Sequence, residues 1–422
     1  MNKKGNNHIK IIVFHPMQQH SYKTAIAVKE AGYLYEYWTS VYFSPEKLLY
    51  KILSLVIGKS NVKRMRNRAN EDLTPYVRTC STFLGLIFIL AGRVTKSRKV
   101  TTKLQVLLSQ KMGRKVARMA IKNGINFVIA YDTWAHGLIN ELERKKSSIK
   151  VIVDFSSLYA EEIVHTIEKD ILLHETSRDS YLELMEKYKP CYMSLYRTEI
   201  EKAHYFLSAS TVVDRSLTKY GVKKEFIFRG TYGTYFRRQD SKKRTDCERI
   251  RFIYIGRLSY AKGVHYLIKA FLGLNRNDYK LLLIGSDVDG FKNQINCENI
   301  EFVGMVHHDE IPHYLSQADI AISASLFDGF SLALLESAAY NLPIICTDNT
   351  GISDYVIDGV NGYKVDSCDE VDLQNAILKV LNQKKDVDLM SIKAGDIVER
   401  LTWENYNSEI KKAIQKIILD SN

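Results

Sequence analysis

The amino-acid sequence predicts an α/β protein made of two doubly wound domains that face each other across a cleft. Three observations support this prediction. The 422 residues exceed what one ordinary core organises, and their 45% hydrophobic and 26% charged content is typical of a folded protein. Short apolar runs alternate with helical patterns through both halves of the chain. A segment rich in Gly, Tyr and charge interrupts this alternation at 222–249.

The first domain is expected to span residues 1–230. Its apolar runs suit strands that are buried on both faces of a parallel sheet. These strands are expected at 8–14, 126–132, 150–156 and 205–210. A helix is predicted from Ser21, a possible N-cap, to Gly32, which stops it. The apolar run near the N-terminus is only four residues long, so it predicts a first strand and not a signal peptide.

The second domain is expected at 251–398, after a linker at 231–250. A helix is predicted from Val264 to Leu272. Strands are expected at 251–257, 280–286, 300–304, 319–323 and 343–347. The last segment, 399–422, is expected to form a helix that packs back toward the first domain. In open sheets of this kind the ligand binds at the carboxyl ends of the strands, so polar residues there are candidates for the site.

Basic residues are concentrated in residues 46–122. This segment holds 18 Lys and Arg against 3 Asp and Glu, whereas the rest of the chain carries a net charge of −3. Between Arg78 and Arg93 stand fourteen uncharged residues, too few to span a bilayer, which takes about 20. They suit a core helix or an interfacial segment. We interpret 46–122 as a basic insertion that binds an anionic membrane surface, with a solvated basic face or nucleic-acid binding as the alternatives.

Cysteines and carboxylates give little sign of a metal. The six cysteines are scattered without zinc-type spacing, which predicts free thiols in a reducing compartment. One Asp-x-Asp pattern, Asp287 and Asp289, has the form of a divalent-cation site. Such short patterns arise often by chance in loops, so no metal is expected.

Two cations follow a strand of the second domain. The strand ends in Gly256, Arg257 comes next, and Lys262 stands before the predicted helix. Arg grips phosphate with two parallel hydrogen bonds, and Lys adds a point charge. Unpaired N–H groups at a helix N-terminus also attract anions. This combination predicts an anion site, with ordinary surface charge on a loop as the alternative.

Two carboxylates bracket a small-residue stretch in the same domain. Asp328 lies in the loop before a predicted helix that Ser331 can cap, and Glu336 lies about one and a half turns inside it. The amides of Ser331 and Leu332 are expected to be free for a phosphate. The carboxylates are expected to point at hydroxyls, because like charges repel.

These stretches resemble the retaining nucleotide-sugar glycosyltransferases of the GT4 (group 1) family, which have the GT-B fold. The resemblance covers about 251–366. It rests on Gly256-Arg257, Lys262-Gly263, Asp328-x7-Glu336, Pro343-Ile344-Ile345 and the run from Asp358 to Val365. Residues 203–222 resemble the family's exit from the first domain, whereas 8–200 match only in outline.

The resemblance implies roles for individual residues. Arg257 and Lys262 would hold the donor diphosphate, Glu336 the ribose hydroxyls, Val306 would flank the base, and Asp328 would contact the transferred sugar. The expected donor-site set is Gly256, Arg257, Lys262, Gly285, Val306, Gly329, Phe330, Ser331, Leu332 and Glu336. The expected catalytic set is Asp328, Arg257, Lys262 and Asp154.

The sequence departs from the family's pattern at three places. Asp328 stands where the family has Glu. The loop after the first strand, 15–23, lacks the frequent Gly-Gly pair, though Lys23 could replace its phosphate contact. Asp154 ends a strand where relatives often have His, so Asp154, His136 or His20 must supply that contact. Acceptor-side candidates are His15, His20 and His136.

We therefore expect a cytoplasmic glycosyltransferase at the inner face of the plasma membrane. It would move a sugar from a nucleotide diphosphate sugar to a hydroxyl of a lipid-linked or polysaccharide acceptor, without a further cofactor. Nucleic acid is not an expected partner. The alternative is a partner subunit that binds nucleotide sugars and has lost the chemistry.

Overall fold

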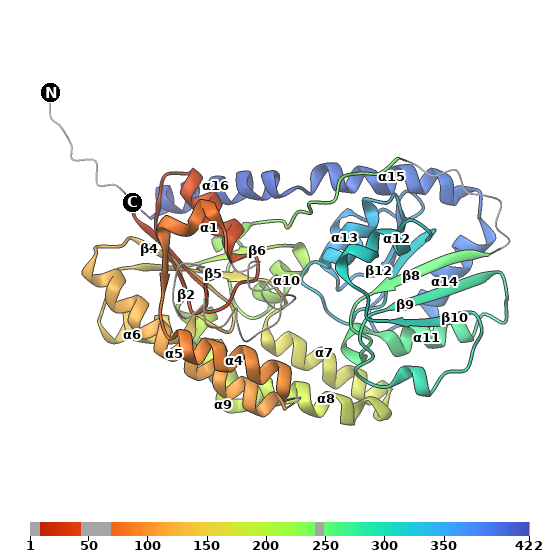
Figure 1. Ribbon diagram of the computed structural model, residues 1–422, viewed down its shortest axis with the longest axis horizontal. Helices are drawn as coiled ribbons and strands as arrows, with labels where there is room; N and C mark the ends of the chain where they lie inside the picture. The colour runs from red at the N-terminus through yellow and green to blue at the C-terminus, as the bar shows by residue number, and fades with distance from the viewer. Residues whose placement is uncertain (1–8, 44–68, 96, 241–248, 422) are drawn as a thin grey trace, which may run out of the picture.

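The computed structural model describes residues 9–43, 69–95, 97–240 and 249–421, and within them it has two parallel sheets, one after the other along the chain. Seven strands form the first sheet in the order β3-β2-β1-β4-β5-β6-β7 (Figure 1). They are β1 (Ile11–Phe14), β2 (Leu34–Thr39), β3 (Val77–Thr79), β4 (Phe127–Tyr131), β5 (Lys150–Phe155), β6 (Tyr205–Ser208) and β7 (Ile227–Arg229). The order reverses between β1 and β4, as in a doubly wound domain.

Six strands form the second sheet in the order β10-β9-β8-β11-β12-β13. They are β8 (Ile250–Ile255), β9 (Tyr279–Ile284), β10 (Ile300–Gly304), β11 (Ile320–Ser323), β12 (Ile344–Thr347) and β13 (Gly362–Val365). Here the order reverses between β8 and β11, which makes the crevice between these two strands the expected binding position. The predicted architecture of two doubly wound α/β domains is confirmed.

Helices cover both sheets (Figure 1). In the first domain they are α1 (Ser21–Glu30), α4 (Thr82–Val94), α5 (Arg98–Lys122), α6 (His136–Arg144), α7 (Ala160–Leu173), α8 (Arg178–Met185), α9 (Pro190–Lys202) and α10 (Thr211–Lys219). In the second part of the chain they are α11 (Val264–Leu272), α12 (Ile311–Leu315), α13 (Leu332–Ala338), α14 (Glu370–Asn382), α15 (Asp386–Arg400) and α16 (Trp403–Asp420).

The C-terminal helix α16 returns to the first domain and packs on α1. The hydroxyls of Thr24 and Tyr406 lie 2.7 Å apart, and Lys411 forms an ion pair with Glu30. The outgoing chain runs beside this return, with a backbone bridge between Thr234 and Thr402. The segment that leaves the first domain and the segment that returns to it are therefore joined by backbone pairing.

The basic stretch 46–122, predicted to be an insertion at the surface, also contributes a helix to the core of the first domain. Residues 44–68, which carry part of its charge, lie outside the described residues. Helix α5 buries a full apolar face that includes Leu108, Met112 and Val116, so it belongs to the core. It packs closely on α6, because a Cβ on Gly113 would lie 2.3 Å from the backbone nitrogen of Leu138. The interpretation of the whole segment as an insertion is therefore wrong for α5.

Helix α4 contains the uncharged stretch and lies largely at the surface. Among its thirteen residues only Gly85 is buried, while Phe83 and Val94 are 79% and 78% exposed. Its inner side still reaches the core, since Phe88 packs on Trp134 with ring centroids 5.7 Å apart. In the described residues, no helix combines the length and the apolar character needed to cross a membrane.

Candidate active site between the domains

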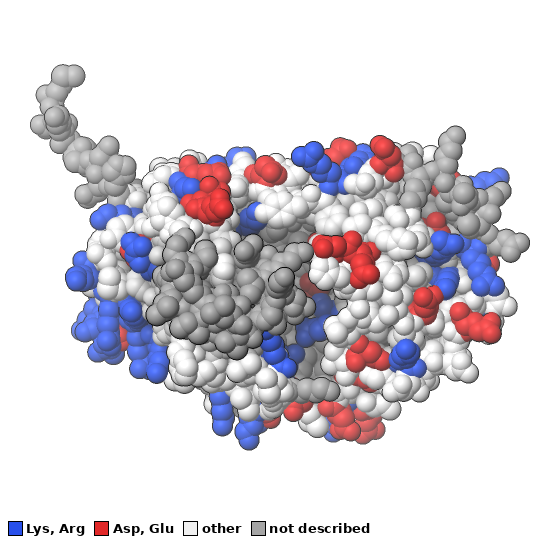
Figure 2. Space-filling view, viewed as in Figure 1, with Lys and Arg blue, Asp and Glu red and all other residues white. Residues whose placement is uncertain are grey.

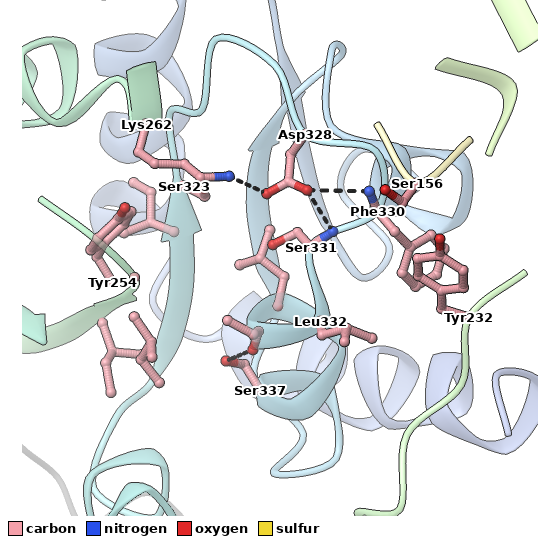
Figure 3. A pocket seen from close by; sticks show the side chains of 16 residues that line it. Ser156, Tyr232, Tyr254, Lys262, Ser323, Asp328, Phe330, Ser331, Leu332 and Ser337 are labelled. Atoms are coloured by element: carbon pink, nitrogen blue, oxygen red, sulfur yellow. Dashed lines mark hydrogen bonds and ion pairs between the residues drawn. The ribbon is translucent and has the colours of Figure 1, made fainter. Parts of the chain in front are cut away.

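A cavity of about 350 Å³ lies at the switch point of the second sheet and faces the first domain (Figure 3). Its floor is the carboxyl end of β8, from Ile253 to Gly256, with Ile322 and Ser323 of β11. Lys262 and the segment from Asp328 to Leu334 form one side. Ser156 and Tyr232 reach it from the first domain. The position is the one that doubly wound topology predicts for a ligand.

Lys262 and Asp328 form an ion pair inside this cavity, with Nζ 2.6 Å from Oδ2 (Figure 3). The other oxygen, Oδ1, accepts hydrogen bonds from the amides of Phe330 at 3.2 Å and Ser331 at 3.1 Å. The prediction that the Ser331 amide is free for a phosphate is therefore wrong, because Asp328 occupies it. The ion pair brings together two of the four predicted catalytic residues.

Ser331 stands at the N-cap position of α13, but its hydroxyl makes no capping hydrogen bond. The residue has φ +67°, a left-handed conformation that is uncommon outside glycine. The predicted capping role is therefore wrong in mechanism: the Asp328 carboxylate holds this turn instead. The helix begins at Leu332, whose side chain is 41% exposed and lines the cavity.

Two glycines allow close backbone approaches at the site. Gly285 has φ +143°, and a Cβ there would lie 1.8 Å from the carbonyl oxygen of Gly256. A Cβ on Gly329 would lie 2.1 Å from the carbonyl oxygen of Ser156, in the other domain. Gly285 therefore shapes the wall behind the cavity, and Gly329 lets the two domains touch.

Arg257 does not line the first cavity but a second one, of about 230 Å³. Phe327 also comes from the second domain, and the remaining lining comes from the first. It includes Arg98, Asp132, Thr133, Ser157, Tyr159, Lys187, Tyr188, Tyr196 and Glu199. Burial is the main cause that raises the pKa of the Asp132 carboxyl to about 6. Figure 2 shows a hollow between the domains that contains Lys and Arg side chains.

The two cavities adjoin each other. Gly256 lines the first and Arg257 the second, Ser156 the first and Ser157 the second, and Asp328 the first and Phe327 the second. Consecutive residues at three separate points therefore form the border between the two spaces.

Glu336 and Val306 are not part of the lining of the first cavity, although Ser337, the residue after Glu336, is. Glu336 Oε1 is 4.0 Å from His308 Nε2, and burial raises the pKa of its carboxyl. Val306, after β10, is half-buried against the core.

Asp154 lies below the site and not in it. Its Oδ2 is 2.8 Å from His20 Nε2, and both side chains are more than 90% buried. The His20 ring contacts the Tyr232 ring at a tilt of 44°, with centroids 4.5 Å apart. Neither Asp154 nor His20 lines either cavity. The structure therefore does not support Asp154 as a catalytic group, because its carboxylate is held in a buried pair.

The other two histidines are also internal. His15 is fully buried, and burial lowers its pKa to about 3, so it is neutral. His136 is fully buried at the start of α6, with Nδ1 3.3 Å from Glu199 Oε1. Glu199 also accepts the amides of Thr133, Ala135 and His136. The two rings line neither cavity, so the structure does not place them on an acceptor.

Lys23 and the two carboxylates of the Asp-x-Asp pattern also have partners within the protein. The Lys23 ammonium lies 4.2 Å from the Tyr235 ring centroid. Asp287 caps the amides of Gly290, Phe291 and Lys292, and Asp289 accepts the Tyr260 amide. These carboxylates hold turns, which accounts for the pattern without a metal.

Sequence reasoning missed Ser156 and Tyr232 as site residues. Ser156 is two positions beyond Asp154, past the last paired residue of β5. Tyr232 falls in the segment interpreted as a linker, where the only signal was its Gly and Tyr content. Tyr254 was also missed; its hydroxyl donates to the Arg257 carbonyl at 2.8 Å and fixes the β8 exit loop.

Comparisons with known proteins agree with this geometry. A sequence model of the family described as Glycosyl transferases group 1 matches residues 236–395. An uncharacterized 41.2 kDa protein in the cps region of Klebsiella pneumoniae is 27% identical over 118 residues, 28% of this chain and 33% of that protein. The alpha-monoglucosyldiacylglycerol synthase of Streptococcus pneumoniae is 23% identical over 329 residues, 73% of this chain and 70% of that protein. The aligned part spans 33% and 48% of the length of the first two relatives.

Solved structures match nearly the whole chain. Sucrose-phosphate synthase of Thermosynechococcus elongatus has a TM-score of 0.64 and 16% identity, and covers 98% of this chain and 100% of that one. Anabaena HepE in complex with UDP has a TM-score of 0.61 and 14% identity, over 97% and 100%. These likenesses show the predicted GT-B fold. The part of the chain that resembles the group 1 glycosyltransferases in sequence, residues 236–395, contains the second sheet and most of the lining of the cavity beside it.

Proposed function

We propose that the protein is a retaining glycosyltransferase of the GT4 type. It moves a sugar from a nucleotide diphosphate donor to a hydroxyl of a membrane-linked acceptor. The observation that carries this proposal is the pair of adjoining cavities at the domain border, one lined by family-motif residues and the other mainly by the first domain. A sugar passing from donor to acceptor crosses that border.

The donor diphosphate is assigned to the entrance between Lys262 and Arg257. The two cations flank the β8 exit loop, one in each cavity. Charge develops on the diphosphate as the bond to the sugar breaks, and fixed cations at the border stabilise that charge without reorganising. The structurally similar HepE was solved in complex with UDP, which supports a nucleotide diphosphate as part of the donor.

Asp328 has two tasks in this proposal. In the free protein it holds the Lys262 ammonium 2.6 Å away, so the cation stays inside the cavity. When a diphosphate takes over Lys262, Oδ2 becomes free to accept a hydroxyl of the transferred sugar. Oδ1 keeps the turn at Phe330 and Ser331 in place throughout.

Glu336 and Val306 are assigned to the nucleoside. Glu336 lies on α13, eight residues after Asp328, and we assign its carboxylate to the ribose hydroxyls of a donor whose phosphates sit near Lys262. Burial raises the pKa of the Glu336 carboxyl group. Two ribose hydroxyls could donate hydrogen bonds to this partly buried carboxylate and so compensate for the lost water. Val306 offers an apolar contact for the base.

The acceptor is assigned to the second cavity. Arg98, Lys187 and Arg257 contribute three cations there, and Asp132 and Glu199 contribute two carboxyl groups. Glu199 is occupied by three backbone amides. Asp132 is therefore the carboxyl group best placed to orient an acceptor hydroxyl, and the cations favour an acceptor with an anionic group nearby.

The surface of α4 and α5 is assigned to an anionic membrane at the cytoplasmic face. Phe83, Leu90 and Val94 of α4 present an apolar surface. Helix α5, which packs on α4, carries exposed cations along its length: Lys99, Lys103, Lys111, Arg114 and Lys122. Figure 2 shows Lys and Arg gathered over the end of the first domain where α5 and α6 lie. Apolar side chains beside clustered cations bind anionic interfaces. The relative from Streptococcus pneumoniae bears a diacylglycerol product in its name, which supports a lipid acceptor.

A turnover assay tests the proposal. Purified protein is mixed with a panel of nucleotide diphosphate sugars and with anionic vesicles that carry lipid acceptors. NMR follows donor consumption and the configuration of the product. We expect one donor to be consumed with retention at the anomeric carbon.

Two results would overturn the proposal. Inversion at the anomeric carbon would contradict the retaining mechanism. Stabilisation by one nucleotide sugar in a thermal unfolding experiment, without any turnover or hydrolysis, would favour the alternative of a binding subunit without chemistry.

A further inference from the structure

Three side chains from the two domains converge outside both cavities. Asp170 lies on α7 of the first domain, His174 is the residue directly after that helix, and His265 lies on α11 of the second domain. One ligand atom from each residue lies within 4.8 Å of the other two. Two imidazoles and one carboxylate at this separation match the ligand types of a transition-metal site.

The cluster is ordered by the helices that carry it. Asp170 lies in the last turn of α7, and His174 follows the helix as its C-cap residue, with the non-helical angles φ −139° and ψ 81°. Asp170 Oδ1 is 3.0 Å from His265 Nε2, the spacing of neighbouring ligands around a tetrahedral ion. Asp170 is fully buried and His265 is 6% exposed, while His174 closes the outer side.

The surroundings hold Asp170 in a fixed orientation. Tyr181 donates to Oδ2 at 2.7 Å, and Tyr266 donates to Oδ1 at 2.8 Å. Hydrogen bonds of this kind orient the ligands of metal sites.

We propose that Asp170, His174 and His265 form a binding site for a divalent transition-metal ion, with Zn²⁺ as the matching ion, which joins the two domains. Three protein ligands leave a fourth position for water. The site is separate from the proposed transfer reaction and does not depend on it.

Lys269 is the group that opposes a cation at this site. Its ammonium lies 3.0 Å from His174 Nδ1. A divalent ion repels that charge, but Lys269 is exposed, so its side chain turns into solvent when the ion binds. The metal therefore competes with Lys269 for His174, and the lysine sets the affinity.

An ion here would link domain position to the phosphate loop. His265 is three residues past Lys262, on the first turn of α11. A metal bond to α7 would fix the start of α11 relative to the first domain. The expected consequence is a more stable closed arrangement of the domains.

Equilibrium dialysis tests the site. The full chain is freed of metal with a chelator, dialysed against Zn²⁺, and its metal content is counted by mass spectrometry. We expect one Zn²⁺ per chain in the wild type, and binding weakened by on the order of tenfold or more in His174→Gln. The matched control is His313→Gln, because His313 is exposed and its ring contacts Gln317 and Tyr314, outside the cluster. Circular dichroism checks that each variant is folded.

Two further measurements sharpen the test. Co²⁺ in place of Zn²⁺ should give the intense visible absorption of a tetrahedral site in the wild type and lose it in His265→Gln. Lys269→Met should tighten Zn²⁺ binding, since it removes the competing charge. Equal Zn²⁺ affinity in the wild type and His174→Gln, or no binding to the wild type, would overturn the proposal.

Discussion

The strand ends of the two domains look alike in sequence and differ in the structure. In the second domain Gly256, Lys262 and Asp328 line the interdomain cavity. In the first, Asp154 and His20 form a buried pair outside both cavities. Both sets follow β-branched runs. A polar residue near the end of a parallel strand therefore does not by itself predict a ligand contact.

The difference comes from where each residue stands relative to the last pair of the ladder. Asp154 is still in register with Leu207 of β6, so it is held within the sheet. Ser156 and Asp328 lie beyond their strands, in loops that are free to face a ligand. Helix α16 completes the burial, because Tyr406 packs near His20 with ring centroids 6.3 Å apart.

The largest expected effect is on transfer, through Arg257. Arg257→Ala should lower kcat/KM by more than tenfold, because it removes phosphate stabilisation of about 1.5–3 kcal/mol. The matched control is Arg251→Ala, at the opposite end of the same strand β8. Steady-state kinetics on the preferred donor measures both. An equal loss of kcat/KM in Arg257→Ala and Arg251→Ala would show that the arginine at the carboxyl end of β8 has no special role in transfer.

Matched substitutions of the two carboxylates separate stability from function. Asp154→Asn should lower the free energy of unfolding by about 1–3 kcal/mol, since it weakens a buried hydrogen bond to a charged group, and should leave kcat within about twofold. Asp328→Asn should change stability by less than about 1 kcal/mol, because the Lys262 pair is partly exposed, yet reduce transfer. Urea unfolding and kinetics measure the four values. A reversed pattern would show that Asp154 belongs to the reaction.

Asp328→Glu addresses sugar choice within the same comparison. The added methylene moves the carboxylate further into the cavity, where the resemblance places the sugar. We expect the ranking of donor sugars to change while the preferred nucleotide stays the same. Competition between paired donors, followed by mass spectrometry, measures the ranking. An unchanged ranking would remove Asp328 from sugar selection.

Asp132 gives a pH-dependent effect in the first domain. Its carboxyl pKa is raised from 3.8 to about 6, so the folded state holds the proton more tightly than the unfolded state. The wild-type free energy of unfolding should therefore fall as pH rises from about 4 to about 6. Asp132→Asn removes this loss. Its stability relative to wild type should be about 2 kcal/mol better at pH 7 than at pH 4. Parallel pH profiles for the two proteins would contradict the burial of this carboxyl group.

The smallest effect concerns the surface of α4. Phe83→Ser with Leu90→Ser should weaken binding to anionic vesicles several-fold, since the two exposed side chains together contribute on the order of 1 kcal/mol when they enter the interface. Leu419→Ser is the matched control: Leu419 is 74% exposed on α16. Vesicle sedimentation measures binding. An equal loss in the control would show that α4 has no special role.

Much of the fold was predictable because many of its strands are continuous apolar runs that are long enough to be recognised in the sequence. Helix α11 and strand β10 fall on the predicted residues, and α1 starts at the predicted Ser21. Strands β2, β3, β7 and β13 were not predicted. β3, β7 and β13 are only three or four residues long, and β2 mixes Glu36 with aromatic residues. In such segments the neighbouring strand decides the structure more than the local sequence does.

The candidate site was predictable where its residues follow recognisable strands at the spacing of the family motifs. Gly256, Lys262 and Asp328 are contiguous with clear strands and line one cavity together. Ser156 and Tyr232 line the cavity from the side opposite the second domain. Their positions depend on how the two domains pack together, which no local sequence pattern encodes. Tyr232 reaches the cavity because its segment is fastened beside α16, at the Thr234–Thr402 bridge.

Titration calorimetry with nucleoside diphosphates tests the central claim most directly, because it measures binding without needing the acceptor. The wild type should bind one nucleoside diphosphate per chain, and Lys262→Met should weaken that binding by about tenfold or more. Lys269→Met, on the outer face of α11, should leave it unchanged. Equal affinity for the nucleotide in the wild type and Lys262→Met would contradict the placement of the donor in this cavity.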